Sequence, residues 1–343
     1  MHSHGVVAPS RAESNHSQPG VAMEAPRRIA SLLAGATEML FGMGLGDRVV
    51  AVSHECDWPS EVASLPRDTW SRVDGEQSSG DIDRQVRESR SAGWPLYEID
   101  GPALARLAPE LIVTQAQCDV CAVRYEDVVR LVADEPALSA ARVVALNPAT
   151  LDDILADIER VGRAAGAVDA AKVYVGDLRR RIARVADTTA RVAAADRSRV
   201  AVIEWIEPLM LASNWTPGLI DLAGGRHGLV EPGLHSTCTQ PADLVEFDPQ
   251  VLVISPCGFD LPRTLLEAPA LAQMPGWNRI SAVKSGRVYG VDGNALFNRS
   301  GPRLVDTLEL LAHLVHPDRC DSPASLRSPP SLWQGLPTMP LSD

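Results

Sequence analysis

The most constraining feature of this chain is a long stretch of helical periodicity between two sections of alternating strands and helices. Apolar residues recur at three- and four-residue steps from Leu151 to about Ala195, with Gly162 and Gly166 interrupting the pattern. This stretch predicts one long helix or a kinked pair. On either side of it, short apolar strands alternate with amphipathic helices, which is typical of βαβ units with a parallel sheet. The sequence therefore predicts an α/β fold of two parallel-sheet, Rossmann-like lobes joined by a long helix, with a ligand cleft between the lobes.

The predicted lobes divide the chain into five parts. These are a flexible N-terminal segment (1–26), a first α/β lobe (27–148), a linker helix (149–196), a second α/β lobe (197–317) and a flexible tail (318–343). His, Ser, Pro and Ala dominate the first part, and Pro and Ser are frequent in the last. Such compositions bury too little apolar surface to order a segment, which is why both ends are expected to be flexible.

The two lobes repeat one motif. Residues 107–113 (LAPELIV) and 247–253 (FDPQVLV) each form a turn with a central proline that leads into an apolar strand. In open parallel sheets, ligands bind beyond the carboxyl ends of the strands. Following the two strands forward brings Cys118 and Cys257 to nearly equivalent places, so we expect both to face a shared cleft.

Composition excludes several classes of function. The chain has 44 acidic and 32 basic side chains and a net charge of -12, and no Lys/Arg cluster is present, so nucleic acid and anionic membranes are poor partners. The sequence contains no run of about eighteen apolar residues, so we expect no segment to insert into a membrane. Residues 1–26 lack the apolar core of a secretory signal, which predicts a cytoplasmic location. Phosphate-binding loops, nucleophile elbows and zinc-protease motifs are missing, and this favours a binding protein over an enzyme.

Four of the six cysteines fall in loops of the predicted cleft and are candidate metal ligands: Cys56, Cys118, Cys121 and Cys257. A Cys-x-x-Cys spacing lets two thiolates reach one metal from a turn, and four thiolates suit a tetrahedral zinc or an iron–sulfur cluster. For Cys118 and Cys121 taken alone, buried or redox-active thiols explain the spacing equally well.

The other candidates are polar or aromatic residues in the same loops, expected to bind a small molecule: Thr37, His54, Glu55, Asp57, Trp58, Gln115, Gln117, Trp205, Trp215, His235, Phe259, Asn294 and Arg299. Indoles at strand ends suit a large flat ligand, and an imidazole can ligate a metal or cobalt. The alternatives are packing between the lobes for the indoles, a helix cap for the threonine and solvated loop charges for the carboxylates.

Several of these segments resemble class III substrate-binding proteins, the type that serves ABC transporters, and within that class the cobalamin-binding branch. The resemblance rests on residues 29–38 (IASLLAGATE), the GLGDRV run at 44–49, the proline-led strands, the long helical stretch and the RSGPR run at 299–303. It covers about residues 28–317. It implies that residues 55–58 line the ligand cleft, that Arg299 contacts the ligand, and that the ligand is cobalamin or a related corrinoid held without covalent chemistry. The alternative function is a metalloprotein with an iron–sulfur cluster or zinc between the lobes. The sequence names no partner protein.

Overall fold

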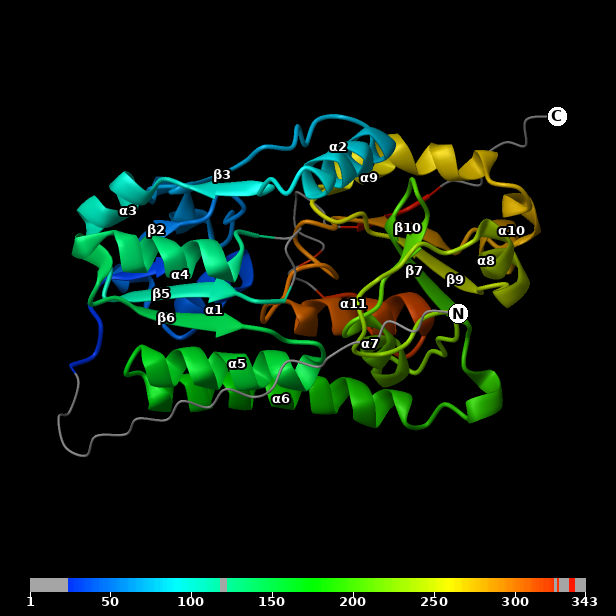
Figure 1. Cartoon of the computed structure of the whole chain (residues 1–343). Helices are drawn as coiled ribbons and strands as arrows, with labels where there is room; N and C mark the ends of the chain where they lie inside the picture. Colours follow the sequence, from blue (N-terminus) through cyan, green and yellow to red (C-terminus); the bar gives the residue numbers. More distant parts are fainter. Residues whose placement is uncertain (1–23, 118–121, 324–325, 327–332, 337–343) are drawn as a thin grey trace, which may run out of the picture.

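The computed structural model describes residues 24–117, 122–323, 326 and 333–336. Most of the predicted N-terminal segment, and both Cys118 and Cys121, lie outside these described residues. Two lobes, each built on its own sheet, lie side by side, and two helices run along one side of the pair (Figure 1). The predicted α/β fold with two parallel-sheet lobes is confirmed.

The first lobe contains a four-stranded parallel sheet in the order β2-β1-β5-β6. Its strands are β1 (Ile29–Ser31), β2 (Val49–Val52), β5 (Leu111–Gln115) and β6 (Arg142–Leu146). The helices of this lobe are α1 (Ala34–Gly42), α3 (Gly101–Leu107), α4 (Tyr125–Asp134) and α5 (Leu151–Ala164). Between β2 and α3 the chain adds a small antiparallel pair, β3 (Thr69–Ser71) and β4 (Tyr97–Ile99), connected through helix α2 (Ser79–Ser91).

The second lobe has a five-stranded sheet in the order β11-β10-β9-β7-β8. Strands β7 (Val200–Trp205), β9 (Val251–Ile254) and β10 (Val288–Val291) are parallel, and the edge strands β8 (Met210–Leu211) and β11 (Trp333–Gly335) are antiparallel to their neighbours. The helices of this lobe are α7 (Thr216–Leu222), α8 (Pro241–Phe247), α9 (Leu261–Glu267), α10 (Ser281–Lys284) and α11 (Leu304–Val315).

The internal repeat seen in the sequence has a matching backbone conformation in the two lobes. The residue after helix α3, Ala108, has φ 43°, and the residue after helix α8, Asp248, has φ 49°, both in the left-handed region. A left-handed residue is a common way to end a helix, and the proline that follows prevents the helix from continuing. Each turn then leads directly into a buried strand, β5 or β9.

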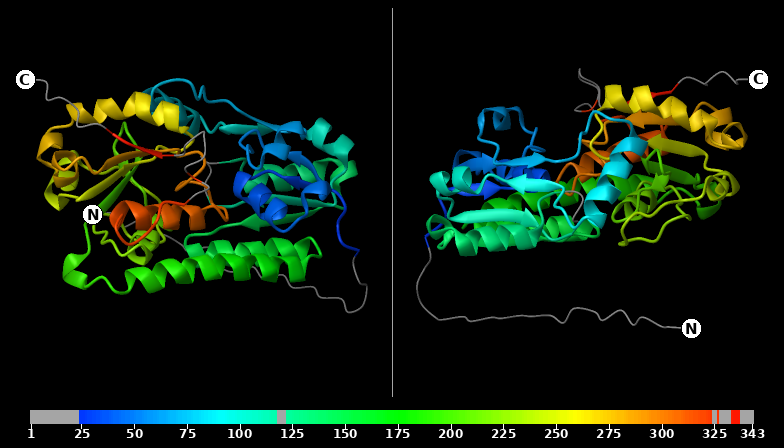
Figure 2. Two further views of the ribbon diagram at one scale, coloured as in Figure 1. Left: turned by 180° about the vertical axis from the view of Figure 1, so that it is seen from behind. Right: turned by 45° about the horizontal axis from the view of Figure 1, so that its top comes forward.

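The predicted long helical stretch is a helical hairpin, not one long helix or a kinked pair. Helix α5 ends at Ala164, the chain reverses through Gly166 with φ 67°, and α6 (Val168–Thr189) runs back along α5. Helix α5 packs against α1 of the first lobe, whereas α6 packs against α11 of the second (Figures 1 and 2). Only α6 therefore connects the lobes as a long helix, and the domain boundaries at 148 and 196 remain predictions.

Alternate residues of the buried strands contribute to different hydrophobic cores. In β9, Val251 and Val253 face a core shared by both lobes, and Leu252 and Ile254 face a second core within their own lobe. The same alternation in β5 separates the shared core from a third, smaller one. The shared core includes residues of α1, α5, α6 and α11, so the two lobes are joined by continuous apolar packing in addition to the α6 crossing.

The predicted flexible tail contributes one strand to the second sheet. Strand β11 pairs with β10 in antiparallel register, with Tyr289 opposite Gly335 and Val291 opposite Trp333. An edge strand presents free backbone donors and acceptors, and these pair with any extended segment irrespective of its side chains. The prediction was therefore wrong for this part of the tail. Among the described helices, none has the length and apolar character needed to cross a bilayer.

Candidate functional site

The two lobes touch where the start of α1 meets the loop between β10 and α11. A Cβ atom on Gly35 would lie 2.1 Å from the backbone oxygen of Ser300, and one on Gly301 would lie 3.0 Å from the Cα atom of Gly35. Only glycine allows such an approach, because any larger residue would force the two backbones apart. This contact brings the loop after β2 next to the loop after β10.

Arg299 is the central residue of this contact. Its guanidinium donates to Glu38 Oε1 at 3.2 Å, forms an ion pair with Asp57, and donates to the backbone oxygen of Glu55 at 3.4 Å and to Asn294 Oδ1 at 2.9 Å. Arg299 and Asn294 belong to the second lobe, and their partners Glu38, Glu55 and Asp57 belong to the first. The planar guanidinium suits several simultaneous hydrogen bonds, so one side chain ties three segments together.

Asn294 and Trp58 extend this cluster toward solvent. The Asn294 amide donates to Asp57 Oδ2 at 2.6 Å while its oxygen accepts from Arg299. The Trp58 ring is 51% exposed, and the Arg303 guanidinium lies 5.0 Å from its centroid. A cation near the ring face is attracted to the aromatic quadrupole, which holds the indole in place. The junction therefore presents a half-exposed aromatic surface beside a buried set of charges.

Glu38 carries the deeply buried carboxylate of the junction. Its side chain is 2% exposed, and it pairs with Arg299 at 3.2 Å and Arg303 at 3.5 Å. Burial raises the pKa of Glu38 to about 7, although both arginines oppose this shift. Its Oε2 atom is buried and has no hydrogen-bond partner. A charged oxygen without a partner is costly, which is why burial favours the protonated form of Glu38.

The loop that carries Arg299 is fixed by an unusual backbone residue. Phe297 is buried and has φ 58°, a conformation that is strained for a bulky side chain. Its backbone nitrogen donates to Thr307 Oγ1 at 3.2 Å, and its backbone oxygen accepts from Trp215 Nε1 at 2.6 Å. Trp215 is itself buried, so this predicted ligand residue packs against the loop and holds it in place instead of facing a ligand.

The polar side chains of the loop after β2 make mostly local contacts. His54 Nδ1 lies 2.7 Å from Thr69 Oγ1, and His54 Nε2 lies 3.2 Å from Glu55 Oε1. The hydrogen bond from His54 lowers the pKa of Glu55. Thr37 lies inside α1 and does not cap it: its hydroxyl donates to Ser31 Oγ at 2.8 Å and lies 3.1 Å from Cys56 Sγ.

The remaining predicted ligand residues are distributed over both lobes. Gln115 is buried, and its Oε1 accepts from the backbone nitrogen of Gln117 at 2.6 Å, so it organises the turn after β5. Trp205 and Phe259 pack together with ring centroids 5.3 Å apart near α2. His235 is exposed in the loop between α7 and α8. Of the predicted residues, the structure therefore brings Glu55, Asp57, Trp58, Asn294 and Arg299 together.

The described residues do not support the predicted four-cysteine metal site. Cys56 is fully buried, its thiol lies 3.1 Å from Thr37 Oγ1, and burial raises the pKa of this thiol to about 11. Cys257 is exposed in the loop after β9. Cys118 and Cys121 lie outside the described residues. Within the part of the chain that the structure describes, no three His, Cys, Asp or Glu side chains are placed to hold a metal ion.

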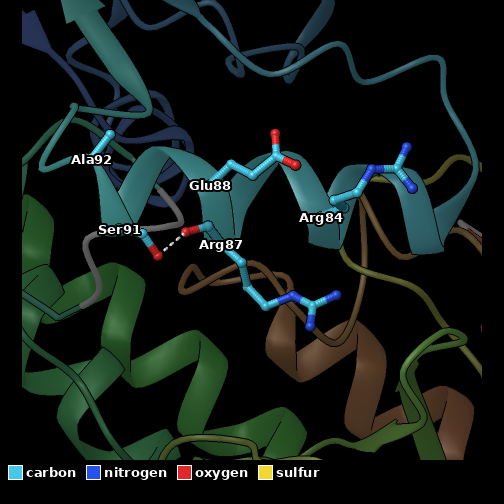
Figure 3. A pocket seen from close by; sticks show the side chains of 5 residues that line it. All are labelled: Arg84, Arg87, Glu88, Ser91 and Ala92. Atoms are coloured by element: carbon cyan, nitrogen blue, oxygen red, sulfur yellow. Dashed lines mark hydrogen bonds between the residues drawn. The ribbon is translucent and has the colours of Figure 1, made fainter.

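A shallow hollow of about 590 Å³ runs along α2 and is lined by Arg84, Arg87, Glu88, Ser91 and Ala92 (Figure 3). Arg84 and Glu88 extend on one side of the helix and Arg87 on the other, and the Ser91 hydroxyl donates to the Arg87 backbone oxygen at 2.8 Å. All five lining residues belong to α2 or to the residue that ends it, so this hollow is a surface groove beside one helix and not a pocket between the lobes.

Comparison with known proteins identifies similar chains. No family model matches this sequence. The chain is 23% identical to the uncharacterised ABC transporter substrate-binding lipoprotein YvrC of Bacillus subtilis over 296 residues, which cover 85% of this chain and 81% of that protein.

Solved structures with a similar fold include three bacterial binding proteins. A periplasmic heme-binding protein from Pseudomonas aeruginosa has a TM-score of 0.65 and 20% identity, with 86% of this chain and 94% of that chain covered. The periplasmic vitamin B12-binding protein BtuF of Vibrio cholerae has a TM-score of 0.60 and 20% identity, with 85% and 98% covered. The periplasmic heme-binding protein RhuT from Roseiflexus sp. RS-1 has a TM-score of 0.62 and 21% identity, also with 85% and 98% covered.

These similarities correct one prediction and confirm another. The predicted cytoplasmic location is wrong, because the similar proteins are a lipoprotein and periplasmic binding proteins, which point to an extracytoplasmic location. The prediction depended on a missing apolar stretch in residues 1–26, and such an absence does not decide where a protein works. The resemblance to class III substrate-binding proteins is confirmed: the chain has their fold, and over most of its length its sequence is similar to that of a substrate-binding lipoprotein of an ABC transporter.

Proposed function

We propose that this chain is an extracytoplasmic substrate-binding protein of an ABC transporter and that it binds a corrinoid or a related tetrapyrrole between its lobes. One observation carries the proposal: the half-exposed ring of Trp58 stands at the junction where Asp57 of the first lobe is bound by Asn294 and Arg299 of the second. A ligand on this surface contacts both lobes at once, and the solved structures with this fold include proteins described as binding heme or vitamin B12.

The chemistry of the junction suits a large flat ligand with polar edges. An exposed indole provides apolar area and a face for stacking. Arg299 is already paired with Glu38 and Asp57, and Arg303 with Glu38. The junction therefore offers a ligand hydrogen bonds at the edge of its surface and no strong unpaired charge. Such a combination of apolar area and a few fixed polar groups is typical of small-molecule sites.

Two observations favour a corrinoid over heme. Heme iron in proteins is held by an axial side chain such as His, Cys, Met or Tyr. In the loop after β2, the two candidate axial residues are turned inward: His54 Nδ1 contacts Thr69, its Nε2 atom is buried 3.2 Å from Glu55, and the buried Cys56 thiol contacts Thr37. A corrinoid that brings its own axial base needs no such side chain, and this is the case that the loop after β2 suits.

The test is a pair of absorbance titrations of the purified chain, one with hydroxocobalamin and one with hemin. We expect saturable binding of hydroxocobalamin, with Trp58→Ala weakening it about tenfold or more because the variant removes the stacking surface. Trp94→Ala is the matched control, since Trp94 is also exposed but lies in the turn before β4, and it should bind like the wild type. Saturable binding of hemin alone would reject the corrinoid, and no binding of either compound would reject the proposal.

A further inference from the structure

Helix α2 is unusual because it buries almost nothing. Ser79 at its first position is buried, and its other residues are exposed or only partly covered. Its two large apolar residues, Ile82 and Val86, lie four positions apart and are only partly covered, so the helix has little apolar surface to hold it on a core. Its end returns through β4 to the first lobe, while its start lies beside α9 of the second lobe (Figures 1 and 2).

The start of α2 is held by polar contacts to the second lobe. Arg263 on α9 donates to the backbone oxygens of Gly75 and Gln77. Glu267, one turn further along α9, accepts from the backbone nitrogen of Ser79 at 3.1 Å, and Trp205 Nε1 donates to the backbone oxygen of Ser79 at 3.2 Å. Ionised groups paired with backbone dipoles form the stronger class of hydrogen bond, so these contacts are the main attachment of α2 to the second lobe.

Arg263 is already oriented by its own lobe. Its guanidinium pairs with Glu267 at 3.1 Å and lies 4.0 Å from the ring centroid of Phe259, and Asp260 caps the first turn of α9 by accepting from the Arg263 backbone nitrogen at 2.9 Å. A side chain that is fixed before it binds loses less conformational entropy on forming the contact. The second lobe therefore presents a preformed docking point for residues 75–79.

This docking point adjoins the proposed ligand site. The backbone nitrogen of Asn294 donates to the backbone oxygen of Phe259 at 3.0 Å, and the side chain of Asn294 bridges Asp57 and Arg299. By contrast, the opposite side of the lobe junction is closed by the shared apolar core of α1, α6 and α11. The α2 side is thus the weakly held side, because exposed polar contacts open at a lower free energy than a packed core.

We propose that α2 is a lid over the lobe junction and that Arg263 and Glu267 form its latch, whose release lets ligand enter and leave. The identity of the ligand that this lid retains rests on the proposed function. The opening of the lid is a property of the chain itself and does not depend on that ligand. In the closed state, the latch holds residues 75–91 against the second lobe. When it opens, residues 75–91 move away from the second lobe while the contacts of Arg299 with the first lobe stay in place.

The first experiment needs no ligand. Amide hydrogen exchange of the full chain, followed by mass spectrometry, should show exchange in residues 75–91 about tenfold or more faster in Arg263→Ala than in the wild type. Glu267→Gln should show the same direction with a smaller effect. Arg84→Ala is the matched control: it removes a guanidinium from α2 that pairs with Asp81 of the same helix, and exchange should stay within about twofold of the wild type. Equal exchange in Arg263→Ala and wild type would overturn the latch.

The second experiment uses hydroxocobalamin as the probe and measures its dissociation rate by displacement. The rate should rise about tenfold or more in Arg263→Ala and stay unchanged in Arg84→Ala, with the same absorbance spectrum of the bound probe in all three proteins. Faster exchange with an unchanged dissociation rate would overturn the role of α2 as a lid. If the wild type binds no hydroxocobalamin, the corrinoid proposal fails, and the exchange result by itself decides whether the latch exists.

Discussion

At the scale of single residues, Glu38 shows how the junction balances burial against charge. Its carboxylate is 2% exposed and contacts two guanidiniums, yet burial raises its pKa from 4.5 to about 7. A carboxylate whose pKa is higher in the folded than in the unfolded chain binds its proton more tightly in the folded state. Its contribution to stability is therefore fully present below pH 4.5 and is lost as the pH rises through 7.

The Glu38→Gln variant tests this sign. Glutamine has the shape of a protonated glutamate and does not titrate, so the unfolding free energy of the wild type relative to the variant should fall between pH 4.5 and 7. The slope should be at most about 1.4 kcal/mol per pH unit. Urea unfolding at several pH values measures it. A relative free energy that rises with pH would show instead that Arg299 and Arg303 keep Glu38 ionised.

The residues of the site differ in how far the sequence could reveal them. Asp57, Trp58, Asn294 and Arg299 lie in loops directly after strands, and the rule for open parallel sheets places such loops together. Glu38 falls in the first turns of α1, where a carboxylate usually serves the helix itself, so its position in the sequence does not single it out. Glu38 is buried because the loop between β10 and α11 of the second lobe approaches α1. The sequence around Glu38 does not predict this long-range contact.

At the scale of elements, the contact of α1 with the loop before α11 depends on glycine. Gly35→Ala should lower the free energy of unfolding by about 2 kcal/mol, because its Cβ atom would lie 2.1 Å from the Ser300 backbone oxygen. Gly176→Ala in α6 is the matched control, since its Cβ atom would meet only the Arg180 side chain at 3.7 Å. The control should gain up to about 1 kcal/mol from helix propensity.

Urea unfolding of both variants measures these two changes. Similar free energies of unfolding for Gly35→Ala and Gly176→Ala would show that the two lobes do not approach each other closely at this point. The comparison is informative because both substitutions place alanine in a helix and differ mainly in what the new methyl group meets.

Elements with apolar periodicity were predictable, and elements without it were not. The strands at 49–52, 111–115 and 142–146 follow from short apolar runs. Helix α2 gives no such signal, because its sequence has no continuous apolar stripe, and β11 is held by backbone pairing at a sheet edge. The turn at Gly166 also illustrates the limit: both helices around it show the expected period, but the reversal between them depends on α6 packing back on α5.

At the scale of the whole molecule, two lobes share one apolar core on one side and meet through polar contacts on the other. The shared core limits how far the lobes can separate, whereas the polar side can open. The sequence predicted two lobes and a connection because the pattern repeats on both sides of the helical stretch. It could not predict the shared core, since the same apolar positions would also satisfy two independent lobes.

The central claim is that a corrinoid binds between the lobes and contacts both. The most direct measurement is amide hydrogen exchange of the full chain with and without saturating hydroxocobalamin. We predict slower exchange in two segments together: residues 54–58 of the first lobe and residues 292–303 of the second, which contain Asp57, Trp58, Asn294 and Arg299. Protection confined to one lobe, or absent from both segments while the compound is bound, would contradict the claim.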